Sequence, residues 1–142
     1  MRNHVRQLED NECGVAAYAT VVEISLDESR QAWEPYRTQP NGWIKHTDMR
    51  DRLIEAEYLK PNCSYSTNFD PAKGDAIIYC RNAENSTSGN KNTDKKSQDD
   101  NGSEWRHYIP FIGGLYYDPH SSTPSRSLKP NLIPSIVYYL DI

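Results

Sequence analysis

Residues 7 to 14 of this chain combine a glutamine, a cysteine and a glycine at a spacing that suits nucleophilic catalysis. Gln7 lies six positions before Cys13, and Gly14 follows the cysteine directly. A catalytic cysteine needs help to ionise, a base that handles its proton, and hydrogen-bond donors for the oxyanion that it creates. The Gln7 amide and the backbone N–H of Cys13 can supply two such donors. Gly14 has no side chain, so a substrate carbonyl can approach the backbone closely.

A histidine and an aspartate late in the chain can provide the base and the group that orients it. His107 and Asp118 flank Gly113 and Gly114, and two glycines are typical of a two-residue hairpin loop because both positions accept a positive φ. That loop would place His107 and Asp118 diagonally on one face of the hairpin, within reach of a hydrogen bond. A three-residue loop would place them on opposite faces. The expected constellation is therefore Cys13, His107 and Asp118.

Each of these residues also has a plainer interpretation. A lone Cys13 is most often a buried core residue, and a lone glutamine, histidine or aspartate is usually an ordinary surface, strand or turn residue. Only the combination favours chemistry. His120 is the one other histidine that we consider as a base. The remaining cysteines, Cys63 and Cys80, are interpreted as structural. The charges near Cys13, which are Glu9, Asp10 and Glu12, are interpreted as capping and solvated.

Helices are expected in the first half of the chain, where they must position the cysteine. Residues 11–24 have apolar side chains at helical spacing and almost no charge, which predicts a helix enclosed by the rest of the domain, with Asp10 or Asn11 as its cap. Ser25 and Glu28 have the spacing of a capping box and predict a second, short helix. A third helix is expected to open at residue 47 or 48.

The second half of the chain is rich in β-forming residues. Pro110 lacks a backbone N–H, so we expect a bulge at that point or a strand whose N–H side is unpaired there. Residues 83–103 contain one alanine as their only apolar residue, which predicts a mobile polar loop. Helices followed by an antiparallel sheet predict an α+β domain. The expected strands are residues 76–80, 105–112, 115–118 and 136–140.

Composition argues against several classes of protein. The 142 residues are expected to form one domain, residues 1–142, and a net charge of −4 gives no reason to expect nucleic acid as a partner. No apolar run reaches the roughly 18 residues that cross a bilayer, so we expect no membrane partner and, without a recognisable signal peptide, a cytoplasmic location. Three cysteines without CxxC spacing argue against a disulfide framework and against a zinc site.

These motifs resemble the papain-like cysteine peptidases that process bacteriocin leaders. The resemblance rests on the Gln-x5-Cys-Gly-x-Ala-Ala block at residues 7–17 and on the later histidine and Asp-Pro pair. It implies a papain-like fold, in which a buried N-terminal helix carries the cysteine and packs on an antiparallel β-sheet. The implied reaction is attack on an amide carbonyl, a thioester intermediate and hydrolysis, with no metal or organic cofactor. The implied nucleophile, base, orienting residue and oxyanion donor are Cys13, His107, Asp118 and Gln7.

The chain also departs from that family. No transporter accompanies the domain, the step from His107 to Asp118 is short, and the polar loop at residues 83–103 looks like an insertion. We therefore expect a peptide or protein substrate without assigning the bond that is cleaved. A glutamine deamidase or a transglutaminase-like effector would use the same cysteine and histidine. A catalytically silent domain that binds a protein partner is the third interpretation, and a regulatory protein partner and delivery into another cell stay open.

Overall fold

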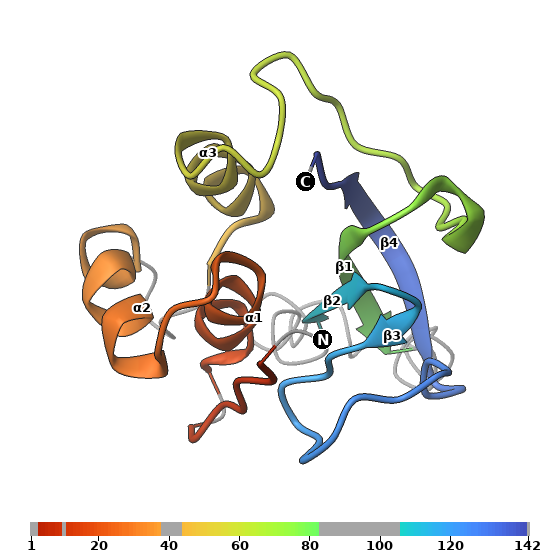
Figure 1. The fold of residues 1–142 in the computed structure, drawn as a ribbon, viewed down its shortest axis with the longest axis horizontal. Coiled ribbons are helices and arrows are strands. Elements are labelled where there is room, and N and C mark those ends of the chain that lie inside the picture. Colours follow the sequence, from red (N-terminus) through yellow and green to blue (C-terminus); the bar gives the residue numbers. More distant parts are fainter. Residues whose placement is uncertain (1–2, 10, 38–43, 83–105, 142) are drawn as a thin grey trace, which may run out of the picture.

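The chain folds into helices packed against an antiparallel sheet (Figure 1), which confirms the predicted α+β class. The computed structural model describes residues 3–9, 11–37, 44–82 and 106–141, so the predicted loop at 83–103 lies outside the described residues. Within the described ranges, no helix is both long enough and apolar enough to span a membrane. The elements are α1 (Cys13–Val22), α2 (Leu26–Trp33), η1 (Glu34–Tyr36), α3 (His46–Glu55), η2 (Pro71–Lys73), β1 (Ala76–Asn82), β2 (Arg106–Ile112), β3 (Leu115–Tyr116) and β4 (Leu132–Tyr139).

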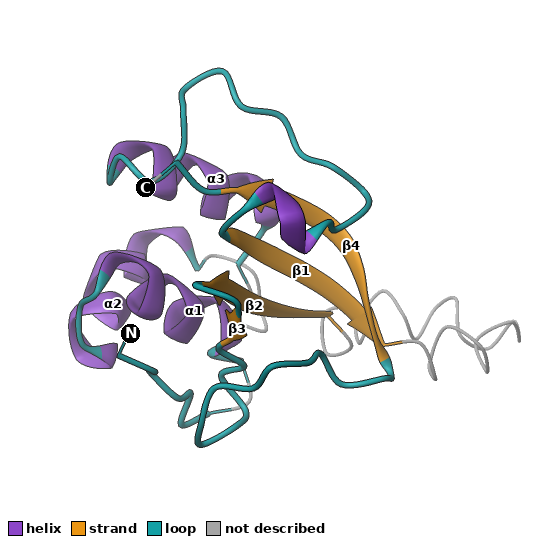
Figure 2. Cartoon of the chain, turned by 45° about the vertical axis from the view of Figure 1, so that its right-hand side comes forward, coloured by secondary structure: helices purple, strands orange, loops and turns teal. Residues whose placement is uncertain are grey.

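The helix α1 lies between α2 and the sheet. It packs against both α2 and β2, and Figure 2 shows the three α-helices gathered on one side of the molecule and the strands on the other. Eight of its ten residues are buried, which accounts for their nearly uncharged sequence. The predicted cap Asn11 is wrong, because Glu12 is the N-cap residue and its side chain makes no cap hydrogen bond; the other candidate, Asp10, lies outside the described residues.

The helices α2 and α3 follow α1 along the chain, as the sequence predicts. The capping box of α2 is confirmed, because the Ser25 hydroxyl accepts from the backbone N–H of Glu28 and the Glu28 carboxylate accepts from that of Ser25. The helix α3 starts at His46, slightly before the predicted opening, and its cap residue Lys45 makes no side-chain cap bond. Its buried side chains, Met49 and Leu53, are four residues apart and face the core.

The sheet has four antiparallel strands in the order β3-β2-β1-β4. The hairpin between β2 and β3 has the predicted two-residue loop, in which Gly113 and Gly114 have φ values of 62° and 84°. Ile112 pairs with Leu115 across it. The loop is tight because both glycines occupy the left-handed region, where a Cβ atom would be strained.

Pro110 does not produce a bulge. Its carbonyl accepts from the backbone N–H of Tyr117 at 2.8 Å, so its nitrogen, which carries no hydrogen, faces the same side, just beyond the end of β3. On that side the residue is paired through its carbonyl alone, so the strand accommodates the missing N–H with neither of the predicted outcomes, a bulge or an unpaired side. The irregularity of the sheet lies elsewhere: the register between β1 and β4 shifts between Tyr79 and Cys80.

Both faces of the sheet are buried. The face toward the helices forms the larger core, where Ile77 and Tyr108 meet residues of all three helices. The opposite face forms a second cluster of sheet residues, among them Ile78 and Ile109, against which Phe69 and Leu128 pack. Neighbouring residues on a strand point to opposite faces, which explains the continuous apolar run Ala76-Ile77-Ile78.

Gly14 lies at a close approach of α1 to its neighbours. A Cβ atom built on this residue would lie 3.0 Å from Cδ1 of Ile44 and 3.1 Å from Cδ2 of Tyr108. Both of these side chains are buried. The sequence interpretation gave Gly14 a role toward substrate, whereas the structure shows a packing reason for glycine at this position.

We expect Gly14→Val to destabilise the fold by about 1–3 kcal/mol, the usual cost of overpacking a dense core. The added methyl groups would force the Ile44 and Tyr108 side chains from their positions. Urea unfolding at neutral pH measures the change. Shortening the isoleucine as well, in Gly14→Val with Ile44→Val, should recover part of the loss, and an unchanged midpoint in the single variant would contradict the close approach.

Candidate active site

The structure brings Cys13, His107 and Asp118 together. Cys13 is the first residue of α1, His107 lies in β2, and Asp118 follows β3. The His107 Nε2 atom lies 2.6 Å from Oδ1 of Asp118. On its other side the imidazole is hydrogen-bonded with the Cys13 side chain. Because Nε2 is hydrogen-bonded with the carboxylate, Nδ1 is the ring nitrogen that is left to form the hydrogen bond with the sulfur.

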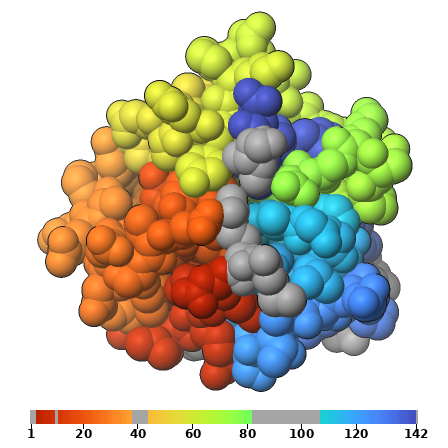
Figure 3. All heavy atoms as spheres, in the orientation of Figure 1, coloured from red at the N-terminus to blue at the C-terminus, as the bar shows by residue number. Residues whose placement is uncertain are grey.

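Two distant parts of the chain form this site. The N-terminal segment runs alongside the segment that follows β3, as the red and light-blue surfaces of Figure 3 show. The backbone N–H of Gln7 donates to the carbonyl of Pro119 at 3.0 Å, and His4 Nε2 lies 2.8 Å from the carbonyl oxygen of Asp118. These bonds fix the loop before Cys13 against the residues that carry the carboxylate.

The site is shielded from solvent. Cys13 is 1% exposed, His107 8% and Asp118 6%. A charged pair in such an environment interacts more strongly than in water. The burial also means that reagents reach the sulfur slowly, so the pH dependence of a reaction at Cys13 is more informative than its absolute rate.

The charge state of His107 follows from its two partners. Burial by itself would lower the pKa of His107, but the hydrogen bonds with Asp118 and with Cys13 outweigh burial and raise the pKa to about 9, from an ordinary 6.5. The ring is therefore an imidazolium at neutral pH. This is the state that stabilises a neighbouring thiolate.

Asp118 is held in its ionised form. Burial raises the pKa of this carboxyl, but the hydrogen bond from His107, the charge of that ring and the backbone N–H of His120 together lower it well below its ordinary range. The N–H of His120 donates to Oδ1 at 2.9 Å, and Nζ of Lys129 lies 3.4 Å from Oδ2. The carboxylate can accept a hydrogen bond from the Nε2–H group of His107 without becoming protonated itself.

We expect Asp118→Asn to lower the pKa of His107 markedly, since the strongest cause of its rise is removed. In the wild type the protonated ring stabilises the fold fully below about pH 6.5, and this contribution is lost as the pH rises through 9. NMR titration of the imidazole should show a midpoint near 9 in the wild type and a lower one in the variant. Equal midpoints would contradict the assigned pair.

Gln7 lies in the loop before Cys13 and is buried. Its side-chain Nε2 donates to the carbonyl oxygen of Glu9 at 2.8 Å. An amide nitrogen carries two hydrogens, so this bond is compatible with a second donation. The structure thus places Gln7 in the same loop as the cysteine, with its amide group fixed by the backbone.

The sequence predicts a capping, solvated charge at Glu12. This residue is the N-cap of α1, but its side chain makes no cap hydrogen bond and is not solvated. Its side chain is 5% exposed and forms an ion pair with Arg30, in which Nε lies 2.5 Å from Oε2. The same carboxylate accepts from the backbone N–H groups of Leu8 and Glu9 at 3.2 and 3.1 Å. In the sequence, only the position of Glu12 directly before Cys13 indicates that it could belong to the site. Nothing in the sequence indicates that Arg30 of α2 faces it.

The remaining cysteines fit structural roles. Cys80 is fully buried, and burial raises the pKa of its thiol to about 12. Burial also raises the pKa of Cys63, which is half-buried. All three cysteines are free thiols. The His120 ring lies with its centroid 4.6 Å from that of His107, and thus beside the site.

No group of three or more histidine, cysteine or acidic side chains in the described ranges is arranged to hold a metal ion. Comparison of the chain with models of protein families, with curated proteins and with solved structures finds no match. The resemblance to bacteriocin-processing peptidases therefore stays a prediction. What can be argued about function comes from the geometry of Cys13, His107 and Asp118.

Proposed function

We propose that this protein is a papain-like cysteine hydrolase that cleaves a peptide or amide bond through a thioester. The observation that carries the proposal is the chain of contacts from Cys13 to His107 and from His107 Nε2 to Asp118 Oδ1, the latter at 2.6 Å. A nucleophile, a base in reach of it and a third group that orients the base are the parts that acyl transfer requires. A position at the start of a buried helix adds the favourable end of the helix dipole.

In the proposed reaction the Cys13 sulfur attacks the carbonyl carbon of the substrate. A carbon–sulfur bond forms, and the electron pair of the carbonyl moves to its oxygen. Collapse of this intermediate breaks the carbon–nitrogen bond, and His107 gives its proton to the departing amine. Water then attacks the thioester, His107 takes a proton from it, and the thiolate leaves. Asp118 keeps the imidazole oriented and offsets its positive charge through both steps.

The developing oxyanion needs donors that are fixed before the reaction. The backbone N–H of Cys13 and the side-chain amide of Gln7 are the proposed pair. Support comes from the burial of Gln7 and from the bond between its Nε2 atom and the Glu9 carbonyl, which holds the amide in one orientation. The side chain of Glu12, the N-cap residue of α1, makes no cap hydrogen bond, so this carboxylate does not occupy the first-turn N–H groups that would face the oxyanion.

The test is the pH dependence of Cys13 alkylation by iodoacetamide, followed by mass spectrometry in the wild type and in His107→Ala. A Cys13–His107 pair should give a labelling profile that is already high near pH 6. In the variant, labelling should rise only toward about pH 8.5, where ordinary thiols ionise. Profiles that coincide, both rising near pH 8.5, would favour a silent binding domain and contradict the proposal.

Product analysis separates the enzyme classes. Peptide and amide substrates would be incubated with the wild type and with His107→Ala. A new amino terminus marks a peptidase, release of ammonia from glutamine marks a deamidase, and a cross-link marks a transferase. We expect new amino termini, the product of the proposed peptidase; a cross-link would require a second amine substrate, whereas hydrolysis needs only water.

A further inference from the structure

We propose that Glu12, held by Arg30, is a positioning residue for the oxyanion donors. This inference rests on the proposed function, because it concerns how the loop before Cys13 is prepared for acyl transfer. Glu12 is neither the nucleophile nor the base. It acts through the backbone that joins Gln7 to Cys13.

The Glu12 carboxylate accepts hydrogen bonds from the backbone of the loop that precedes it. Its Oε1 atom accepts from the N–H groups of Leu8 and Glu9, at 3.2 and 3.1 Å, so the side chain reaches back along the loop away from α1. The backbone N–H of Glu12 in turn donates to the carbonyl of Glu9 at 3.1 Å. Hydrogen bonds in both directions close the loop into a ring directly before the cysteine.

The same ring fixes the amide of Gln7. The carbonyl of Glu9, which accepts from the backbone of Glu12, also accepts from Nε2 of Gln7 at 2.8 Å. A shift of residues 8 and 9 would therefore move the Gln7 side chain and the start of α1 relative to each other. Displacement of one oxyanion donor by about 1 Å is enough to cost a large factor in rate.

Arg30 makes this arrangement electrostatically stable. Its Nε and Nη2 atoms donate to Oε2 and Oε1 of Glu12, at 2.5 and 3.0 Å, which is the bidentate geometry of a strong charged pair. Burial raises the pKa of Glu12, but the Arg30 and backbone hydrogen bonds outweigh burial and lower it. Arg37 also holds this loop, because its Nη2 atom donates to the carbonyl of Asn11 at 3.1 Å.

The ionisation of Cys13 depends on different contacts. His107 lies in β2, and its partner Asp118 follows β3, whereas Glu12 and Arg30 belong to the N-terminal loop and to α2. The two networks can therefore be separated by experiment. Loss of Glu12 should impair addition to a carbonyl and leave the thiolate–imidazolium pair in place.

Two probes of Cys13 make this separation. Iodoacetamide alkylates Cys13: the sulfur attacks the methylene carbon, a carbon–sulfur bond forms and iodide leaves, so this step creates no oxyanion. p-Nitrophenyl acetate is attacked at its carbonyl, so a carbon–sulfur bond forms, an oxyanion appears, and the ester carbon–oxygen bond breaks to release p-nitrophenolate. In Glu12→Gln we expect acylation of Cys13 to slow by about 10- to 100-fold. The alkylation rate at pH 6 should stay within about twofold of the wild type.

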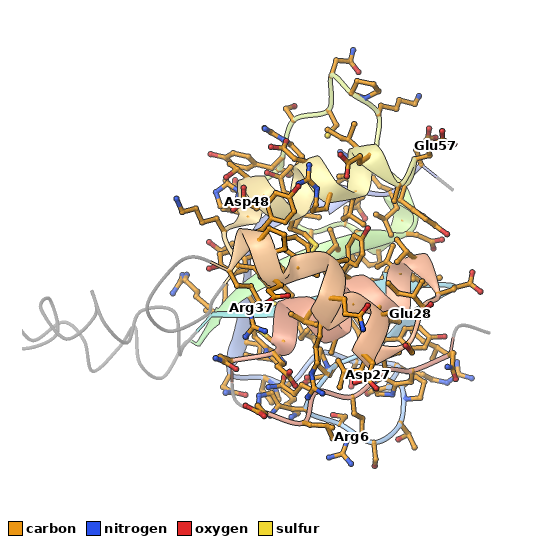
Figure 4. The ribbon with its side chains drawn as sticks, turned by 90° about the vertical axis from the view of Figure 1, so that its left-hand side faces the viewer. Arg6, Asp27, Glu28, Arg37, Asp48 and Glu57 are labelled. Carbon is orange, nitrogen blue, oxygen red and sulfur yellow. The ribbon has the colours of Figure 1, made fainter. Side chains whose placement is uncertain are left out.

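The chain offers a matched control on the same arginine. Asp27 also pairs with Arg30, at 3.3 Å, but its side chain is 84% exposed, and Figure 4 labels it on the α2 side of the molecule. Asp27→Asn should leave both rates unchanged, since an exposed pair contributes little. If Glu12→Gln lowers the folded fraction, the double variant Glu12→Gln with Arg30→Met removes both charges and is measured in its place.

The outcomes are distinct. Slow acylation with normal alkylation supports the inference. Acylation at the wild-type rate in Glu12→Gln overturns it, and so does an equal fall of both rates, which would mark a general loss of structure. If the wild type itself shows neither a high labelling profile at pH 6 nor acylation at Cys13, the proposed function fails and the inference fails with it.

Discussion

Cys13→Ser should abolish amide hydrolysis, with a loss on the order of 10⁴-fold or more in kcat/KM. A serine hydroxyl is nearly the size of a thiol but ionises far less readily, so the imidazolium of His107 has no thiolate to stabilise. The pair of charges that we infer at the site would therefore not form. Hydrolysis of a substrate found by peptide screening, followed by liquid chromatography, measures the change.

A cysteine elsewhere in the chain provides the control for this substitution. Cys63→Ser removes a half-buried thiol whose pKa is raised by burial and which lies outside the candidate site. Its hydrolytic activity should equal that of the wild type. Retention of activity in Cys13→Ser, or its loss in both variants, would contradict the assignment of Cys13 as nucleophile.

Trp33→Ala should lower the free energy of unfolding by about 3–5 kcal/mol, the largest stability effect that we expect from one substitution. Trp33 is fully buried at the end of α2, and its ring packs edge-on against Tyr18 of α1 at a centroid distance of 5.4 Å. Removing the indole leaves a cavity between the two helices. Urea unfolding followed by circular dichroism measures the loss.

Two further variants sharpen this prediction. The Nε1 atom of Trp33 has no hydrogen-bond partner among the described residues, so Trp33→Phe gives up apolar area but also removes a buried donor that costs free energy. Its loss of stability should be clearly smaller than that of the alanine variant. Gln31→Ala, on the exposed surface of the same helix, should stay within about 0.5 kcal/mol of the wild type. Equal losses in the two Trp33 variants would contradict the packing account.

The helix α2 contributes both to the stability of the domain and to the candidate active site. The helix is docked on α1 through Trp33 and through the Ser29 hydroxyl, which donates to the carbonyl of Val15 at 2.7 Å. It also carries Arg30, which holds Glu12 directly before Cys13. A weakened α2 is thus expected to impair the loop before the cysteine as well as the stability of the domain.

Local patterns in the sequence were sufficient for several elements of the fold and for one half of the site. Ser25 and Glu28 predicted the start of α2 because a capping box involves only neighbours along the chain. Gly113 and Gly114 predicted the hairpin loop, and the loop fixed which side chains share a face. The pairing of His107 with Asp118 followed, since the two are only 11 residues apart.

Contacts between distant segments could not be derived in this way. The contact between Cys13 and His107 requires that α1 pack against β2, and no local pattern determines that packing. The role of Glu12 was missed for the same reason. A carboxylate beside a helix start looks like a cap, and only the position of α2 shows that Arg30 binds it and turns it toward the loop.

The sequence alone therefore determined which residue types were available for acyl transfer and which neighbours each would have within its own hairpin or helix. The tertiary structure decided which of these parts meet, and it decided the charge of His107, because burial and two partners set its pKa together. The physical reason is the range of the interactions. Capping and hairpin geometry act over a few residues, whereas burial and ion pairs depend on how whole elements pack.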